Sequence, residues 1–501
     1  MLCKRKIFTN EEYKYIYPGG SNIRRIYGLP KTHKLSSTNK KLKLRPIISS
    51  INTYNYNLAK YLCNKLAPHI PSDYSTRDTF TFINEISKIH SRNKFMISFD
   101  VCSLFTNIPL EETISIAVKL LIENDPNIGM NEDELKTLFK FATCKSHFLF
   151  NDEIFDQTDG VAMGSPLGPV LANIFMGYHE KMWILNYSGI KPEIYKRYVD
   201  DIFCLFQNEE EASLFFDYLN NQHPNISFTC EKEMDGKLSF LDVLIKNINT
   251  ENFETSVYRK ETFTGLLTNF VSFIPKLYKL ALIKTLINRI FCICSNWKMF
   301  HQNLNDLKVI LDKNQFPSKL VDITVKNFLE KVLEKNENHD EKETVSSYFR
   351  LPYIGPHSDF VSTKLKMLSK QFCKNTEIKL SFSMFKIGNM FSVKSRAPQY
   401  LKSGVVYQFI CAGCNNSYVG ETCRYFDTRV HEHLHKASCP SSIYKHLQEN
   451  PICKSKCDKS CFKIIDSART KFTLEVKEAI HTYWLKPEIT KQKYLFITIS
   501  I

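Results

Sequence analysis

The sequence predicts a multidomain α+β protein. Its 501 residues are enough for two to four domains with hydrophobic cores, and 43% hydrophobic with 24% charged residues is ordinary for globular chains. Two runs rich in aromatic and β-branched residues, Ile194–Val199 and Ile202–Phe206, flank a short polar break, which is typical of a β-hairpin. From Gly404 the pattern changes to short β-type runs followed by Cys- and His-rich sequence, so we place a domain boundary near residues 395–403.

The remaining elements follow from hydrophobic periodicity and from helix and turn signals. Residues 94–99 form a buried strand that ends at Asp100, and Asn131 with Glu134 is suited to cap a helix. Helices are expected at 56–70, 76–90, 110–124, 131–142, 170–185 (with Pro169 at the first helical position), 211–221, 276–334 for the most part, and 471–486. Extended pieces are expected within 20–50 and near 227–230, 238–245 and 253–259.

The formal net charge is +15, and it is unevenly distributed. Residues 1–45 hold 12 lysines and arginines against two glutamates, with tyrosines such as Tyr13, Tyr15 and Tyr17 interleaved. Basic side chains displace counterions from a polyanion and aromatic rings stack on bases, so this segment suits nucleic acid. A solvated basic arm would have the same composition.

The chain has 16 cysteines, and its N-terminus, MLCKRK, has no apolar run behind it, so no secretory signal is expected. The most apolar long stretch, Leu266–Cys294, is interrupted by charged residues and excludes a spanning helix. We therefore expect reduced thiols, some of them ligating metal, in a protein of the nucleus or cytoplasm that is neither secreted nor bound in a membrane.

Three carboxylates carry the first candidate site. Asp100 ends a predicted strand, and Asp200 with Asp201 lies at the predicted hairpin tip. Carboxylates from neighbouring strands can clamp the two divalent cations that nucleotidyl transfer requires, and Mg²⁺ prefers such oxygen ligands. A solvated Asp-Asp turn is the alternative for the tetrapeptide Tyr198–Asp201 taken alone.

These residues resemble the motifs of reverse transcriptases. Phe99-Asp100 to Phe105 resembles their first metal-binding motif, Gly164–Gly168 their nucleotide-site motif, and Tyr198-Val199-Asp200-Asp201 their second carboxylate motif. The resemblance implies a right-hand polymerase with fingers, palm and thumb, in which Asp100 and Asp200 ligate both Mg²⁺ ions and Asp201 assists.

The same resemblance implies the residues that bind substrate. Lys31 and Arg45 correspond to basic residues that hold the incoming triphosphate, and Phe105 to the aromatic residue that blocks a 2′-hydroxyl. Gly164, Pro166 and Gly168 shape the loop that lets template and nucleotide approach the backbone. An ordinary core aromatic is the alternative for Phe105.

Four segments narrow the resemblance to Penelope-like retroelements: residues 27–34, 99–109, 240–242 and 258–265. The resemblance implies fingers and palm at 1–275, a helical thumb-like region at 276–345, a connector at 346–400 and an endonuclease at 401–492. Glu261 stands where the family usually has proline. The family usually carries a long region before Gly28-Leu29-Pro30-Lys31, so a truncated copy with impaired RNA binding is an alternative expectation.

The C-terminal segment resembles GIY-YIG nucleases through Val405-Val406-Tyr407, Tyr418–Thr422, Arg429-x-x-x-His433 and Glu478. The resemblance implies that Tyr407 and Tyr418 position or activate water and that Arg429 steadies the phosphate. Glu478 would hold a divalent cation, and His433 would transfer a proton or serve as a ligand. Val405 replaces the usual first glycine, and Thr490 the usual late asparagine.

Cys411-x-x-Cys414 lies between the two tyrosine motifs. The Penelope-like resemblance implies a structural Zn²⁺ held by these cysteines and two histidines. The candidate histidines are His433, His435 and His446; the sequence does not choose among them, and His435 with His446 is the working pair. A second cluster has spacing that allows a helix face or a second metal; it comprises Cys439, Cys453, Cys457 and Cys461.

The combined hypothesis is an RNA-directed DNA polymerase joined to a DNA endonuclease. The nuclease nicks target DNA, and the exposed 3′-hydroxyl primes copying of an RNA template with dNTPs. Two alternatives stay open: a nuclease attached to an inactive polymerase scaffold, and a nucleic-acid-binding protein without catalysis.

Overall fold

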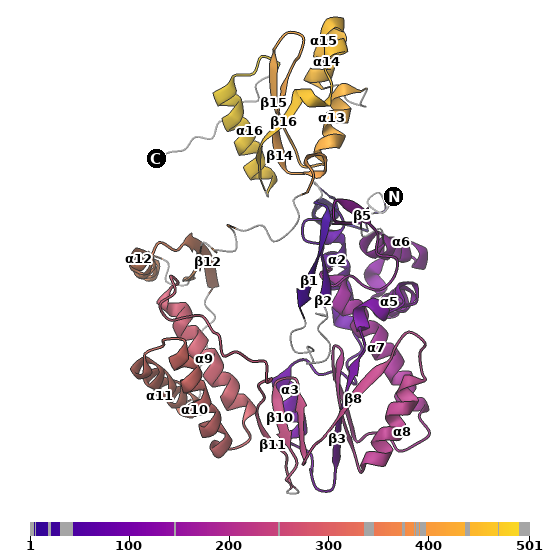
Figure 1. Cartoon of the computed structure of the whole chain (residues 1–501), viewed down its shortest axis with the longest axis vertical. Coiled ribbons are helices and arrows are strands. Elements are labelled where there is room, and N and C mark those ends of the chain that lie inside the picture. Colours follow the sequence, from indigo (N-terminus) through magenta and orange to yellow (C-terminus); the bar gives the residue numbers. More distant parts are fainter. Residues whose placement is uncertain are drawn as a thin grey trace. The chain divides into compact units, whose positions relative to one another are not determined.

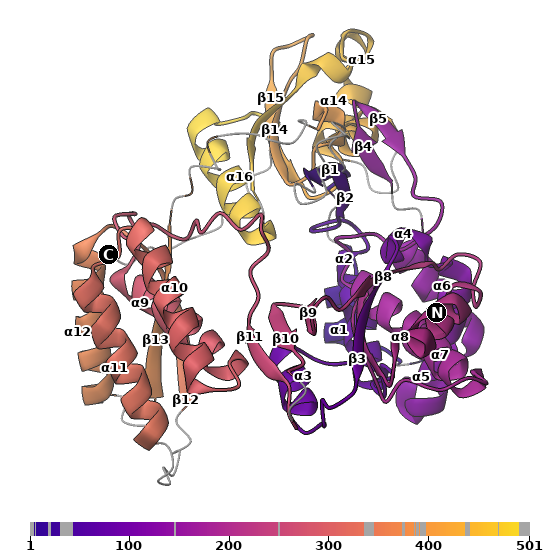
Figure 2. The same cartoon turned by 60° about the horizontal axis from the view of Figure 1, so that its bottom comes forward.

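The computed structural model describes residues 5, 7–18, 22–30, 44–144, 147–248, 251–334, 345–372, 376–384, 386, 390, 397–435, 441–468 and 470–489. The chain divides into two compact units (Figures 1 and 2). One comprises residues 1–71, 103–180 and 393–501, and the other comprises residues 72–102 and 181–392. Within the described ranges, no helix is long and apolar enough to cross a bilayer.

The second unit contains a four-stranded antiparallel sheet in the order β6-β7-β3-β8. Its strands are β3 (Phe95–Val101), β6 (Ile194–Tyr198), β7 (Asp201–Phe206) and β8 (Phe228–Lys232). β3 and β7 are central: β7 is buried from Ile202 to Phe206, and β3 has only buried and half-buried residues. Helix α8 (Glu209–Asn220) contacts β3, β7 and β8, and Asn208 caps its N-terminus. The hairpin predicted at 194–206 is confirmed.

A second sheet in this unit has the order β11-β10-β9, formed by β9 (Lys237–Phe240), β10 (Val243–Lys246) and β11 (Glu254–Val257). The strand expected at 238–245 is therefore two strands, because the chain turns at Leu241, whose φ is +56°. Helix α3 (Thr79–Ile86) packs its apolar face on β9 and β10. Phe82 on α3 contacts Phe203 on β7 as well as Phe240 on β9, so one core joins the two sheets.

Three helices follow in the same unit: α9 (Lys276–Ile293), α10 (Trp297–Lys313) and α11 (Ser318–Glu334). They share a core built on isoleucines of α9 and leucines of α10, and they lie together in Figure 1. The expected helical region over 276–334 is confirmed. The segment expected as a connector contains regular structure: β12 (Val345–Pro352) and β13 (Thr376–Ser383) pair in parallel, and helix α12 (Pro356–Phe372) lies between them in the sequence.

The first unit begins with α1 (Asn10–Ile16) and a sheet in the order β2-β1-β4-β5. The strands are β1 (Arg24–Pro30), β2 (Leu44–Ser49), β4 (Phe148–Phe150) and β5 (Glu153–Phe155). Its helices are α2 (Tyr56–Leu66), α4 (Leu104–Asn107), α5 (Leu110–Asn124), α6 (Glu132–Thr143) and the part of α7 (Leu167–Asn186) up to residue 180.

Two predictions concern the ends of these helices. Asn131 and Glu134 form the expected capping box at α6, with each side chain accepting from the other residue's backbone N–H. Pro169 was expected at the first position of α7, but the helix begins at Leu167, so this prediction is wrong by two residues. The turn residue Pro166 precedes the helix instead, and Pro169 still lies in the first turn, where no intrahelical N–H donor is needed.

The C-terminal module has a sheet in the order β15-β14-β16, with β14 (Val405–Ile410), β15 (Ser417–Thr422) and β16 (Phe462–Ser467). Helix α16 (Lys471–Leu485) covers one face through Leu474 against Val406. Helices α13 (Phe426–Leu434), α14 (Ser442–Glu449) and α15 (Pro451–Lys456) lie on the other face, as both overall views show. Alternating side chains of β14 thus enter two different cores.

Candidate functional site

Asp100 and Asp201 lie directly opposite each other on the neighbouring strands β3 and β7. The backbone N–H of Val101 donates to the carbonyl oxygen of Asp200 at 3.0 Å, which fixes the hairpin tip against the end of β3. Opposed residues of an antiparallel pair point to the same face with Cβ atoms about 5 Å apart. The structure therefore brings together Asp100 and Asp201, two of the three carboxylates that the sequence predicted, and fixes the backbone of Asp200 beside them.

The tip that carries Asp200 has an unusual backbone. Val199 has a φ of +59°, a conformation that β-branched residues rarely adopt and that costs about 1–3 kcal/mol. Arg197, whose side chain is buried, donates from Nη1 to the carbonyl oxygen of Val199 at 3.1 Å. The buried guanidinium thus holds a strained turn next to the carboxylates.

A hollow of about 310 Å³ opens beside Asp100 and Asp201. Strands β3, β8 and β9 and the chain just after β11 supply its walls. Its polar lining includes Thr229, Tyr258 and Lys260. The carboxylates therefore face a polar space that also holds a positive charge.

These carboxylates fit a divalent cation. Asp100 and Asp200 are partly exposed and Asp201 is exposed, so water and substrate phosphates have access to complete an oxygen shell. The donor set contains only hard oxygen atoms, which suits Mg²⁺ better than a softer metal.

The predicted nucleotide loop belongs to the other unit. Gly164 has a φ of +125°, and a Cβ there would lie 2.4 Å from the carbonyl oxygen of Ile48 on β2, so only glycine fits. The loop is fixed to that strand, since Ser50 Oγ donates to the Gly164 carbonyl oxygen at 2.6 Å and Ile48 N–H donates to Met163.

The remaining expected substrate-binding residues lie around this loop or on the same sheet. Phe105 on α4 is half-buried, and its carbonyl oxygen accepts from Val161 N–H at 2.7 Å. A Cβ on Gly168 would lie 3.8 Å from the Phe105 ring. Pro166 forms the turn before α7, and Arg45 is exposed on β2. Lys31 lies outside the described residues.

A comparison with protein-family models covers the segment that contains Asp100, Gly164–Gly168, Asp200 and Asp201. Residues 30–233 match the model described as reverse transcriptase (RNA-dependent DNA polymerase). Residues 30–233 are thus similar to reverse transcriptase domains. A second model, described as an animal helix-turn-helix domain, matches residues 266–326, which cover α9, α10 and the start of α11.

Solved polymerase structures resemble the chain in part. Telomerase from Candida albicans in complex with a fragment of telomeric RNA is 10% identical, with 64% of this chain and 61% of that chain covered and a TM-score of 0.43. The Sicinivirus 3Dpol RNA-dependent RNA polymerase is 13% identical, with 65% and 71% covered and a TM-score of 0.40. The chain thus spans less than two thirds of that telomerase chain. No curated protein matches it.

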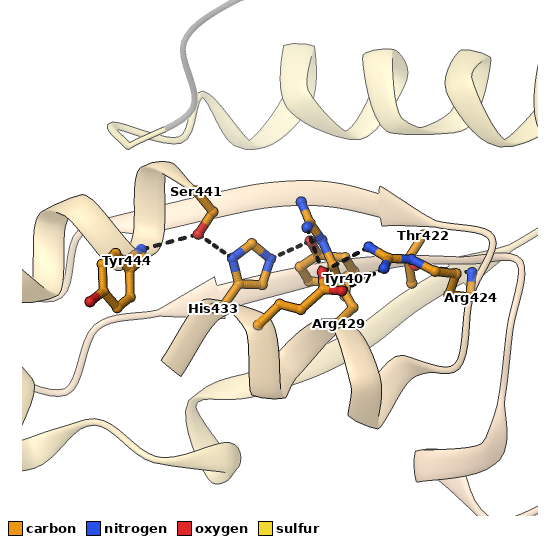
Figure 3. Close-up of polar contacts among 8 residues, drawn as sticks. Tyr407, Thr422, Arg424, Arg429, His433, Ser441 and Tyr444 are labelled. Carbon is orange, nitrogen blue, oxygen red and sulfur yellow. Dashed lines mark hydrogen bonds and ion pairs between the residues drawn. The ribbon is translucent and has the colours of Figure 1, made fainter. Parts of the chain in front are cut away.

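Downstream of residues 30–233, a second polar network is buried in the C-terminal module. Tyr407 on β14 and His433 on α13 are fully buried, and the Tyr407 hydroxyl lies 2.7 Å from His433 Nε2. Arg429 Nε donates to the same hydroxyl at 3.2 Å. Figure 3 shows this network continuing from His433 Nδ1 to Ser441 Oγ, 2.7 Å away.

Burial sets the protonation of this network. Burial and the nearby Arg429 guanidinium lower the pKa of His433 to about 3, so the imidazole is neutral at pH 7. Burial raises the pKa of Tyr407 well above its usual range, and burial likewise raises the pKa of Tyr418. The Glu478 carboxylate on α16 acts in the same direction on both tyrosines, which places it near them.

Arg429 is held from a second side. Glu432, one helical turn further along α13, accepts from Arg429 Nη1 at 3.0 Å and from both terminal nitrogens of Arg424 (Figure 3). Burial alone would lower the pKa of Arg429, but its contacts with Tyr407, Tyr418 and the Glu432 carboxylate raise it overall, so the guanidinium keeps its charge.

The adjacent cysteine cluster has the dimensions of a zinc site. Its members, whose ligand atoms all lie within 4.8 Å of one another, are Cys411, Cys414, His446 and Cys453. His446 Nε2 lies 3.5 Å from Cys411 Sγ and 3.5 Å from Cys414 Sγ. A tetrahedral ion with Zn–S of about 2.3 Å and Zn–N of about 2.0 Å separates sulfur from nitrogen by about 3.5 Å.

Burial raises the pKa of the Cys411 thiol, but hydrogen bonds with His446 and with the N–H groups of Cys414 and Gly413 outweigh burial and lower that pKa to about 6. The thiolate form that binds metal is therefore accessible at neutral pH. A Cβ on Gly413 would lie 2.8 Å from Cys453 Sγ, so the Cys411–Cys414 loop closes on Cys453 only with glycine there.

Of the expected ligand pair, His446 is part of the cluster and His435 is not. His435 follows the end of α13, stacks on His431 with ring centroids 4.1 Å apart, and is not part of the cluster. Cys453 on α15 takes the fourth place. Cys457, four residues further along, lies 3.6 Å from Cys411, sulfur to sulfur, beside the cluster and not among its four members. Cys439 and Thr490 lie outside the described residues.

Three residues of the nuclease-like centre were missed from sequence: Arg424, Glu432 and Ser441. Glu432 immediately precedes His433 and lies three residues after Arg429. On a helix, residues three apart lie on the same face, so this spacing was a usable signal for an ion pair between Arg429 and Glu432. Ser441 carried no such signal, because its contact with His433 Nδ1 joins the N-cap of α14 to a residue on a different helix, α13.

Proposed function

We propose that this chain is an RNA-directed DNA polymerase coupled to a GIY-YIG endonuclease, as in Penelope-like retroelements. The observation that carries the polymerase assignment is the direct opposition of Asp100 and Asp201 within the segment similar to reverse transcriptase domains. The same proposal includes the expected domain division: fingers and palm at 1–275, a helical thumb-like region at 276–345, a connector at 346–400 and the endonuclease at 401–492.

In the polymerase, Asp100 and Asp200 would hold two Mg²⁺ ions, with Asp201 assisting. When bound, these ions activate the attacking 3′-oxygen and stabilise the leaving pyrophosphate. The polar hollow beside Asp100 has room for the end of a primer, where the ammonium group of Lys260 would neutralise a backbone phosphate. Arg45 and Lys31 would bind the triphosphate of the dNTP, and the ring of Phe105, beside the Gly164–Gly168 loop, would exclude a 2′-hydroxyl.

In the endonuclease, Arg429 supplies a fixed positive charge for the scissile phosphate, because Glu432 and Tyr407 hold its guanidinium from two sides. The buried hydroxyl of Tyr407 positions this guanidinium. Tyr418, which is partly exposed, has better access to a water molecule. Glu478 would hold a divalent cation, which supplies charge stabilisation at the phosphate when bound.

The cluster around Cys411 would hold a structural Zn²⁺. Its ligands would come from the loop after β14, from α14 and from α15, and a closed set of four protein ligands leaves no open coordination position. Such an ion would stabilise the module that carries the nuclease residues.

The substrates would be an RNA template, a DNA target whose nicked strand serves as primer, and dNTPs. Target-primed reverse transcription follows if both centres act in sequence. The chemistry requires access to chromosomal DNA, which is consistent with a nuclear or cytoplasmic protein.

Two assays on the full chain test the two activities separately. Primer extension on an RNA template with Mg²⁺ and dNTPs should be lost in Asp100→Ala and Asp200→Ala but kept in Glu478→Gln. Nicking of supercoiled plasmid should show the reverse pattern. Extension that survives Asp100→Ala would overturn the polymerase site, and nicking that survives Glu478→Gln would overturn the nuclease site. Nicking without any extension by the wild type would leave a nuclease alone.

A further inference from the structure

Ser441 connects a helix cap to the buried network of the nuclease-like centre. It is the N-cap of α14, and its Oγ accepts from Tyr444 N–H at 3.1 Å. The same oxygen lies 2.7 Å from His433 Nδ1 (Figure 3). A serine oxygen offers one proton, so the proton is free to point at the imidazole while the backbone N–H of Tyr444 occupies a lone pair.

The direction of this proton determines the rest of the network. If Ser441 donates to His433 Nδ1, the neutral imidazole carries its proton on Nε2 and donates to the Tyr407 hydroxyl oxygen. Arg429 Nε already donates to that oxygen. With two donors on its oxygen, the Tyr407 hydroxyl directs its own proton away from both, to the side of β15 where the Tyr418 hydroxyl lies.

The geometry at Gly420 supports this direction. Tyr407 pairs with Gly420 across β14 and β15, and a Cβ at Gly420 would lie 2.9 Å from the hydroxyl oxygens of both Tyr407 and Tyr418. The two hydroxyls thus share one small space that glycine leaves open. His433 is buried and its ring is neutral, so the ring carries one proton, on either Nδ1 or Nε2. The choice between these two tautomers sets the direction of the hydrogen bonds on both sides of the ring.

We propose that Ser441 is a positioning residue that holds His433 in the tautomer protonated at Nε2 and thereby directs the proton of the buried Tyr407 hydroxyl toward the Tyr418 hydroxyl. This proposal rests on the proposed endonuclease function. It assigns Ser441 a role beyond capping α14, and it makes His433, which has no exposed surface, a relay within the protein and not a group that touches DNA.

Substitutions at Ser441 separate the two roles. Glycine is a nearly equivalent N-cap, so Ser441→Gly keeps α14 but removes the hydroxyl. Ser441→Thr keeps both the cap and the hydroxyl. In plasmid nicking by the full chain, Ser441→Gly should lower kcat about tenfold with KM for DNA within about twofold, and Ser441→Thr should restore kcat. A cap-only role predicts that Ser441→Gly nicks like the wild type, and that result would overturn the proposal.

The tautomer provides a readout that does not depend on activity. The full chain labelled with ¹⁵N-histidine should show the His433 resonance, identified by its absence in His433→Gln, with the proton on Nε2 in the wild type. A wild-type ring protonated at Nδ1 would refute the assignment. If the wild type does not nick DNA, the endonuclease proposal fails, while the tautomer of His433 still decides whether Ser441 donates to it.

Discussion

Replacing His433 by glutamine should remove a pH-dependent weakness of the C-terminal module. The fully buried imidazole has a pKa of about 3, against about 6.5 in an unfolded chain. Between these values the unfolded state binds more protons than the folded state, so the folding stability contributed by the neutral ring falls as the pH drops below 6.5. From pH 7 to pH 5 the loss is about 2 kcal/mol, or roughly a 25-fold larger opening constant.

Hydrogen–deuterium exchange of peptides from α13 measures this change directly in the full chain. After correction for intrinsic exchange, the wild type should show roughly 25-fold weaker protection at pH 5 than at pH 7. His433→Gln should show much less pH dependence, since glutamine does not titrate. His435→Gln, at an exposed position just past the same helix, provides the control and should behave like the wild type. Equal pH dependence in the wild type and His433→Gln would refute the reasoning.

Three further predictions concern other parts of the chain. Val199→Gly should raise the free energy of unfolding of its unit by about 1 kcal/mol, measured by urea unfolding, because glycine adopts a positive φ without the strain of a β-branched residue. The same substitution should lower primer extension. An unchanged free energy of unfolding would show that the turn is not strained. Phe105→Ala should raise ribonucleotide incorporation relative to dNTPs by roughly tenfold or more in single-nucleotide extension, whereas a loss of stability with unchanged discrimination would indicate a core role. Cys453→Ser should abolish binding of about one Zn²⁺ per chain, measured by metal analysis after dialysis, while His435→Ala retains the ion; the opposite result would restore the histidine pair inferred from sequence.

Local pattern was enough to find the hairpin and its carboxylates. The apolar runs on each side of Asp200 and Asp201 have strand composition, and β6 and β7 formed where these runs lie. The register that places Asp100 opposite Asp201 was not readable, because it joins strands about 100 residues apart and depends on which side chains fill the core between β7 and β9.

Long-range geometry also explains what the sequence did not reveal in the C-terminal module. Spacing identified Cys411 and Cys414, but the fourth position of the cluster depends on how α15 folds back onto β14, which brings Cys453 and not His435 to the site. Ser441 is found only through its contact with His433. Local signals thus locate candidate residues, while their partners depend on packing between distant segments.

The most direct test of the account asks whether both centres act on one DNA molecule. Intact supercoiled plasmid, an RNA template, Mg²⁺ and labelled dNTPs are incubated with the full chain, and label joined covalently to a plasmid strand is measured on a denaturing gel. The account predicts labelled plasmid with the wild type and none with Asp200→Asn or Glu478→Gln, and it predicts that a plasmid already nicked restores labelling by Glu478→Gln. Labelling of intact plasmid by Glu478→Gln, or none by a wild type that nicks and extends in separate assays, would contradict it.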